Sequence, residues 1–223
     1  MNGLLDAGLF TIPEAAGLVG ADKRALRVWV EGRSRQAPLI DNQIGRVGRI
    51  VAVSFTNLME LRFVSVFVDA GVKLRVIRSI LNDVREEFKR PHPFATNIVF
   101  LTDGKRIFVQ IAKKNGIDLI DYKTRNYEML DVVISSLKKD VKYDPTGDAV
   151  YWKPRPKIAP NVIVHPSFSF GQPIIRASRI PTEALAKAYE VEGSAGIVAE
   201  IYEVPEAQVR EAVRFERELR QAA

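Results

Sequence analysis

The sequence predicts a mainly α-helical chain with small β elements, which is an α+β fold. Apolar residues recur at helical spacing near both ends of the chain, and short apolar runs beside glycine and Asp-Gly turns predict a few short strands. Proline clusters divide the chain into segments. We expect a winged helix-turn-helix at 1–92, a small α+β module at 93–152, a Pro-rich linker at 153–160 and a three-helix bundle at 161–223.

Two short capped helices are predicted at the N-terminus. Thr11 and Glu14 have the spacing of a capping box, in which each side chain bonds the backbone N–H of the other residue. Gly20 supplies a tight turn, and Asp22 caps a second helix that stops at Gly32. This pattern predicts a helix-turn-helix.

The second of these helices has one apolar and one basic side. Its apolar side consists of Ala25, Leu26, Trp29 and Val30. Lys23, Arg24 and Arg27 remain on the other side. A helix anchored by Leu and Trp that presents cations near its N-terminal half suits the DNA major groove. A small helical hairpin with a solvated basic face is the alternative interpretation.

A basic hairpin is expected to follow, with bends at Gly45 and Gly48. Its cations are Arg33, Arg35, Arg46 and Arg49. Residues 20–50 contain seven Lys and Arg and three acidic residues, so this stretch has a net charge of +4 out of +6 for the chain. Such a concentration is typical of a surface that binds DNA phosphates, and a basic wing would position the protein on the DNA backbone.

The composition argues against several classes of protein. The chain of 223 residues contains no cysteine, so it has no disulfide, thiolate metal site or cysteine nucleophile. No apolar run has the length of a membrane span and no signal-peptide pattern is present, so we expect a cytoplasmic protein without membrane contact. The two histidines, His92 and His165, are far apart, and no glycine-rich phosphate loop is present. We therefore expect no catalytic residue, metal or cofactor, and no enzymatic activity.

Two longer helices are expected before the first proline break at 91–93. The first, over 54–70, is apolar on most sides, which is typical of a helix that is deeply buried or shared with a partner. The second, over 72–89, has a seam of apolar residues at heptad spacing. This seam could pack on the helix-turn-helix or form a homodimer contact, since two-fold DNA sites are usually bound by dimers.

The middle module is predicted from an Asp-Gly hairpin turn at 103–104 and further short apolar runs. Its expected elements are strands at 98–101, 107–111, 117–122 and 150–152, and a helix at 127–137. Its aromatics, such as Phe108 and Tyr122, fit a hydrophobic core better than a nucleic-acid platform.

The C-terminal segment begins with a strand at 162–164 and continues into three helices. These helices are expected from 182 to about 191, over 195–202, and from 205 to 220. Glutamates interrupt the arginines of the last helix, which makes it a poor phosphate ligand and favours a contact with a protein.

Three stretches of this C-terminal segment resemble a known bacterial module. Residues 170–182, 202–205 and 212–216 are similar to a domain long catalogued as one of unknown function, which recurs in VapB-type antitoxins. Residues 11–32 resemble the MerR-like helix-turn-helix of some longer members. The family usually has two adjacent glycines where this chain has Phe170 and Gly171.

The resemblance implies an antitoxin of a type II toxin–antitoxin system. Its N-terminal part would bind operator DNA and repress its own operon, and the rest would neutralise a PIN-like ribonuclease toxin encoded by the adjacent gene, as a homodimer within a toxin–antitoxin hetero-oligomer. The candidate toxin contacts are Arg214, Arg217 and Arg220. Pairing within the helix, such as Glu216 with Arg220, is the alternative for these arginines. A MerR-like regulator whose C-terminal part senses a ligand or another protein is the alternative function.

Overall fold

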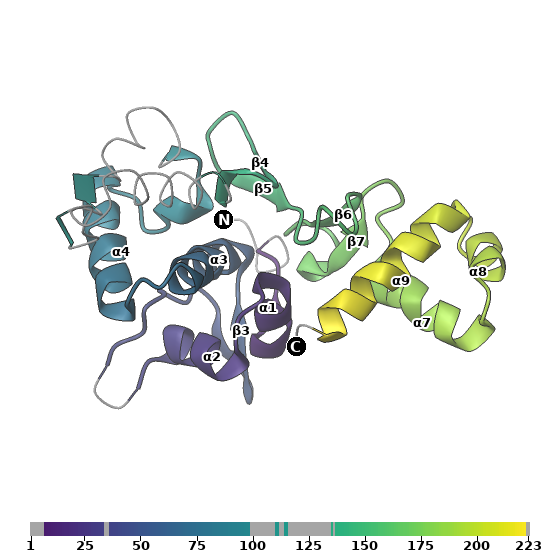
Figure 1. Cartoon of the computed structure of the whole chain (residues 1–223), viewed down its shortest axis with the longest axis horizontal. Coiled ribbons are helices and arrows are strands. Elements are labelled where there is room, and N and C mark those ends of the chain that lie inside the picture. The colour runs from purple at the N-terminus through teal and green to yellow at the C-terminus, as the bar shows by residue number, and fades with distance from the viewer. Residues whose placement is uncertain are drawn as a thin grey trace. The chain divides into compact units, whose positions relative to one another are not determined.

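The mainly α-helical fold with small sheets is confirmed by the computed structural model, which describes residues 7–33, 36–98, 110–111, 114–115, 135 and 137–221 (Figure 1). The chain divides into two units. The first unit consists of Met1–Arg27, Asn42–Phe55 and Val150–Ala223, and the second of Val28–Asp41 and Thr56–Ala149. The first unit therefore joins the start of the helix-turn-helix to the C-terminal module, two segments that the sequence assigns to different domains.

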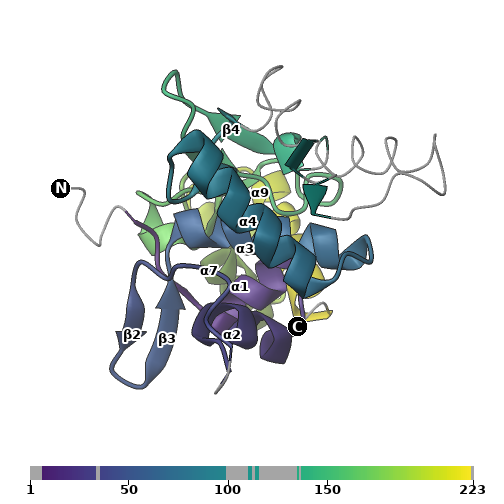
Figure 2. The ribbon, with the colours of Figure 1, turned by 90° about the vertical axis from the view of Figure 1, so that its left-hand side faces the viewer.

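The N-terminal half of the first unit contains α1, the start of α2 and the wing. Its elements are β1 (Phe10–Thr11), α1 (Ile12–Val19), the start of α2 (Lys23–Glu31), β2 (Gly45–Val47) and β3 (Ile50–Val53). The strands form an antiparallel sheet in the order β1-β3-β2, with Phe10 opposite Val53 and Gly45 opposite Ala52. Figure 2 shows β2 and β3 as a hairpin next to α1.

The C-terminal half of the first unit is a small sheet followed by three helices. Its elements are β5 (Ala149–Trp152), β6 (Val162–Val164), the 3₁₀ turn η4 (Ser169–Gly171), β7 (Pro173–Ile175), α7 (Thr182–Glu192), α8 (Ala195–Ile201) and α9 (Glu206–Gln221). Figure 1 shows α9 running along α7, with α8 at one end of the pair. Leu185, Val198 and Phe215 are fully buried, one from each helix, so the predicted three-helix bundle has a common core.

The second unit is built on α3 (Phe55–Asp69) and α4 (Leu74–Phe88), followed by the 3₁₀ turn η2 (Pro93–Ala95) and the strand β4 (Val141–Tyr143). Phe94 stacks on Phe63 of α3 with ring centroids 3.6 Å apart. Most apolar residues of α3 are buried, although Val68 near its end is 36% exposed. The central seam residues of α4, Ile77, Leu81 and Val84, are buried, whereas Leu74 at its start is 42% exposed. Burial within the chain thus accounts for most, but not all, of both apolar patterns.

Most of the predicted middle module lies outside the described residues. This holds for the strand expected at 117–122 and for most of the strands expected at 98–101 and 107–111 and of the helix expected at 127–137. The strand prediction at 107–111 is wrong at its described end, because residues 110 and 111 are helical. The strand expected at 150–152 is present as part of β5. Within the part of the chain that the structure describes, no helix combines the length and hydropathy needed to cross a membrane.

Candidate functional site

The helix-turn-helix has the caps that the sequence predicts. The Thr11 N–H donates to the Glu14 carboxylate at 2.7 Å, and the Glu14 N–H donates back to Thr11 Oγ1 at 3.4 Å. Gly20 ends α1 with a left-handed φ of 76°, and the Asp22 carboxylate accepts from the Ala25 N–H at 2.9 Å. Local hydrogen bonds alone therefore set the turn between α1 and α2.

The cations of α2 lie on its exposed side. Lys23, Arg24 and Arg27 are all exposed, whereas Leu26 is fully buried. Trp29 and Val30 are also buried, so the predicted amphipathic pattern is correct, except that Ala25 is only half-buried. The N-terminal turns of α2 thus present positive charge that the apolar side holds in place.

The β2–β3 hairpin carries two exposed arginines at or next to its turn. Arg46 lies opposite Val51, and Arg49 occupies the two-residue turn after Gly48, whose φ is 62°. Val47 and Ile50 beside the turn are 54% and 55% exposed. The tip of the wing is therefore apolar and is flanked by cations, a feature that the basic residues of the hairpin alone do not indicate.

Arg33 and Arg35 do not belong to this hairpin. Arg33 is exposed but lies in the second unit, where its N–H and carbonyl pair with Gln36. Arg35 lies outside the described residues. The structure therefore brings five of the seven predicted DNA-binding cations into the first unit: Lys23, Arg24, Arg27, Arg46 and Arg49.

The C-terminal module is joined to the helix-turn-helix by specific contacts within the first unit. The Leu9 N–H donates to the Phe170 carbonyl at 2.8 Å. Arg155 donates to the carbonyls of Gly17 and Leu18 at 2.9 and 2.8 Å, where α1 leaves its last carbonyls without helical partners. The segment predicted as a linker at 153–160 thus caps α1, and Ala159 within it is fully buried.

Two glutamates of α9 are internal side chains. The Glu211 carboxylate accepts from the backbone N–H and the Nδ2 of Asn161 at 2.7 and 3.1 Å. Thr182 Oγ1 donates to Glu216 at 2.5 Å, and burial raises the pKa of Glu216. These carboxylates hold the β6 and α7 ends of the module, so α9 presents less negative charge at its surface than its sequence suggests.

The three predicted toxin-contacting arginines differ in their surroundings. Arg214 and Arg217 are exposed on α9, whereas Arg220 donates to the Glu190 carboxylate of α7 at 2.6 Å. The alternative pairing within the helix, Glu216 with Arg220, is not formed, because Glu216 turns inward to Thr182. Arg220 pairs with Glu190 of α7 instead.

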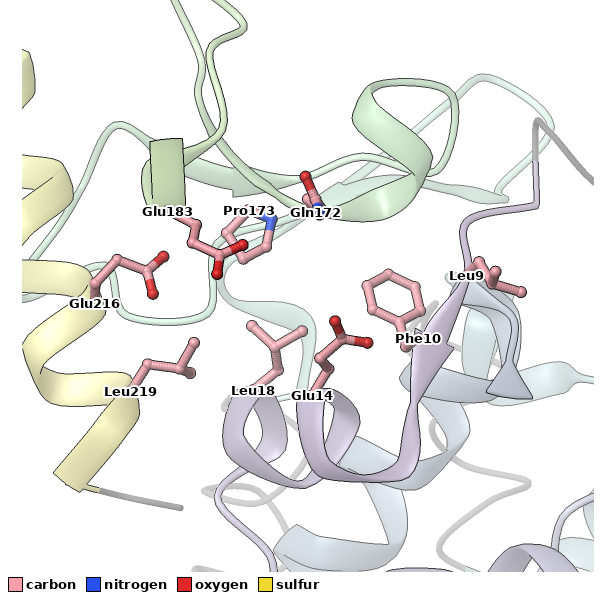
Figure 3. Close-up of a pocket in the computed structure, with 9 residues that line it drawn as sticks. All are labelled: Leu9, Phe10, Glu14, Leu18, Gln172, Pro173, Glu183, Glu216 and Leu219. Atoms are coloured by element: carbon pink, nitrogen blue, oxygen red, sulfur yellow. The ribbon is translucent and has the colours of Figure 1, made fainter. Parts of the chain in front are cut away.

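A cavity of about 170 Å³ lies between α1 and the C-terminal module (Figure 3). Apolar residues, among them Leu18 and Leu219, form its walls, and Figure 3 shows the carboxylates of Glu14, Glu183 and Glu216 reaching into it. Each carboxylate has an internal partner: Glu14 caps α1, Glu183 pairs with Lys187 at 2.6 Å, and Glu216 accepts from Thr182. No group of acidic or histidine side chains among the described residues has the arrangement of a metal site.

Large apolar side chains are exposed on two helices of the C-terminal module. Val191 near the end of α7 is 82% exposed, and Ile197 and Ile201 of α8 are 46% and 59% exposed. Helices α7 and α8 contact each other, and Ile197 and Ile201 are four residues apart and so share one face of α8. Exposed aliphatic groups of this size favour a contact with another protein.

Comparison with known proteins gives one family match, which lies in the C-terminal module. Residues 162–215 match the family described as "Protein of unknown function (DUF433)". The crystal structure of Rv2018 from Mycobacterium tuberculosis is similar to this chain, with a TM-score of 0.72 at 19% sequence identity over 92% of this chain and 96% of that one. At this identity, the similarity shows a shared fold alone. No curated protein matches the sequence.

Proposed function

We propose that the chain is an operator-binding antitoxin, which represses its own operon and neutralises a PIN-like ribonuclease toxin. One observation carries the DNA-binding half of this proposal. Five exposed cations, on the N-terminal half of α2 and on the β2–β3 hairpin, belong to the same unit as the helix-turn-helix. Cations of α2 would meet base edges and phosphates in the major groove, while Arg46 and Arg49 would lie along the flanking backbone.

Substitution of the α2 arginines tests DNA binding. We expect Arg24→Ala or Arg27→Ala to weaken binding to the DNA upstream of the gene by roughly 1–3 kcal/mol, because each removes a contact to a base or phosphate. Fluorescence anisotropy at several salt concentrations measures the affinity and its salt dependence. Arg75→Ala, an exposed arginine of α4, is the matched control. Unchanged affinity of both α2 variants at matched salt would contradict the assignment of α2.

The antitoxin half of the proposal rests on the resemblance of the C-terminal module to VapB-type antitoxins. The exposed apolar residues of α7 and α8, together with the exposed Arg214 and Arg217, supply side chains for a protein contact. Arg220 would have to leave Glu190 to reach a toxin, so we expect it to contribute less. The alternative function, a regulator that senses a ligand, has the cavity of Figure 3 in its favour.

Co-expression with the product of the adjacent gene separates the two functions. An antitoxin is expected to form a stable stoichiometric complex, and Ile197→Asp or the pair Arg214→Ala and Arg217→Ala should weaken it at least tenfold, or about 1.4 kcal/mol. Arg210→Ala is the control, since Arg210 is an exposed arginine of the same helix that pairs with Glu206. A purified neighbour that forms no complex would remove the antitoxin and leave the regulator.

A further inference from the structure

The C-terminal module contains a basic stretch that the net charge of the chain conceals. Residues 149–182 include no Asp or Glu, but they contain five cations: Lys153, Arg155, Lys157, Arg176 and Arg179. The glutamates of α7 to α9 offset this charge when the whole C-terminal segment is counted. Arg155 is used internally to cap α1. Of the other four cations, Lys157, Arg176 and Arg179 are exposed and Lys153 is half-buried.

A tight turn after β7 presents Arg176 and Arg179. The Arg176 N–H donates to the Asn161 carbonyl at 2.8 Å, and the Arg179 N–H donates to the Ile175 carbonyl at 2.8 Å. Arg179 adopts a left-handed backbone with a φ of 60°, a conformation that costs energy in a residue other than glycine. The turn therefore holds both arginines in fixed positions at the end of the sheet.

Both guanidinium groups stack on aromatic rings. Arg176 lies over the Tyr151 ring at 5.3 Å from its centroid, and Arg179 lies over the Phe168 ring at 4.4 Å. Within the described parts of the chain, neither guanidinium has a hydrogen bond or an ion pair with a carboxylate. Stacking on a ring leaves the N–H edges of an arginine open, which is the arrangement that binds phosphate oxygens.

His165 extends this cluster. Its ring lies 4.4 Å from that of Phe168, and its Nδ1 accepts from the Ser167 N–H at 3.2 Å. In the antiparallel sheet, Trp152 pairs with Val164 and Val162 pairs with Ile175, so these four side chains lie on one face. Successive side chains of a strand point to opposite faces. Tyr151, His165 and Arg176, each next to one of the paired residues, therefore share the other face. Burial and the nearby charge of Arg179 lower the pKa of His165.

An unpaired aromatic side chain follows in the same loop. Phe170 is 62% exposed, two residues after Phe168, and its φ is 55°. Glycine adopts such a φ without strain, whereas a residue with a side chain rarely does. The turn thus forms with phenylalanine at the cost of backbone strain, and it presents a ring to solvent.

We infer that this arginine–aromatic cluster, formed by Tyr151, His165, Phe168, Phe170, Arg176 and Arg179, binds a single nucleic-acid strand. Arg176 and Arg179 would hold phosphates of the backbone, and the exposed Phe170 ring would stack on a base. Cations interleaved with aromatics are the features by which single strands are bound without base-pair recognition. An acidic protein surface would engage the arginines but has no use for the exposed ring, so nucleic acid is the better match.

Binding of an oligothymidylate of about 12 nucleotides to the full chain tests this inference. We expect salt-dependent binding that falls at least tenfold in the double variant Arg176→Gln, Arg179→Gln. Phe170→Gly should reduce the affinity for the oligonucleotide roughly five- to a hundredfold, because it removes the ring that stacks on a base. The fold should be kept, because glycine suits the left-handed backbone. Lys73→Gln, which removes an exposed charge from the second unit, is the control and should leave binding unchanged. An RNA strand of equal length shows whether the sugar matters.

The two histidines provide an independent readout of where the strand binds. The chain has only His92 and His165, so their Hε1 ring protons give two NMR signals. A bound phosphate would offset the charge of Arg179, so we expect the His165 pKa to rise on binding and the His92 signal to stay unchanged.

Absence of binding at low salt would overturn the inference, as would binding that survives the substitutions of Arg176, Arg179 and Phe170. An equal change of the His165 pKa with polyglutamate of matched charge would also overturn it, because that result would indicate an acidic protein partner. The outcome is separate from that for operator binding, because Arg24→Ala should leave single-strand binding intact.

Discussion

Replacing Glu60 by alanine is expected to lower the free energy of unfolding of the second unit by about 3–5 kcal/mol. The Glu60 side chain is fully buried, and its two oxygens accept from Arg85 at 3.0 Å and from His92 Nδ1 at 2.9 Å. Alanine would remove the carboxylate and leave both partners facing an apolar void. Since Arg85 also donates to the Pro91 carbonyl at 3.0 Å, the connection from α4 to η2 would loosen as well.

Urea denaturation followed by tryptophan fluorescence measures this effect. Trp29 belongs to the second unit and Trp152 to the first, so a Trp152→Phe background reports on the second unit alone. Glu87→Ala, an exposed glutamate of α4, is the control and should change stability by no more than about 0.5 kcal/mol. A loss below 1 kcal/mol for Glu60→Ala would show that the buried pair contributes little.

Substitution of Gly171 by alanine is expected to destabilise the first unit by about 2–4 kcal/mol. Gly171 has a φ of 90°, and an added Cβ would lie 2.6 Å from Cζ of Phe10 and 3.1 Å from Cα of Gly8. Phe10 pairs with Val53 of the wing sheet, so the clash would displace the strand that supports the hairpin. We therefore expect weaker DNA binding in addition to lower stability.

A second glycine separates the clash from backbone strain. Gly193 ends α7 with a φ of 66°, and no atom lies within 4 Å of a Cβ built there. Gly193→Ala should therefore cost only the strain of a left-handed alanine, about 1 kcal/mol. Fluorescence of Trp152 in a Trp29→Phe background follows the first unit for both variants. Equal losses for the two substitutions would refute the close contact between Gly171 and Phe10.

The elements of this fold could be predicted from the sequence wherever the deciding interactions are local. The Thr11–Glu14 capping box, the stop at Gly20 and the Asp22 cap each depend on residues within a few positions of one another. The same is true of the exposed cations of α2, because a helix with Leu26 and Trp29 on one side must present Lys23, Arg24 and Arg27 on the other. Periodicity also located the three C-terminal helices within one or two residues.

Interactions between residues far apart in the chain were not predictable in this way. The sequence could not show that Arg155 caps α1, since 137 residues separate it from Leu18. It counted Glu211 and Glu216 as surface charges, whereas both carboxylates turn inward to bond Asn161 and Thr182. It grouped Arg33 with the wing, although the hairpin begins only at β2 and Arg33 belongs to the second unit.

The sequence by itself determined the helices, their caps and the basic side of α2, because these follow from hydrogen bonds and side-chain periodicity within a few residues. Only the tertiary structure decided that α1 and the start of α2 form one unit with the C-terminal module, and that Arg176 and Arg179 stack on Tyr151 and Phe168. Such contacts depend on how strands and loops distant in sequence meet, which no local pattern of residues specifies.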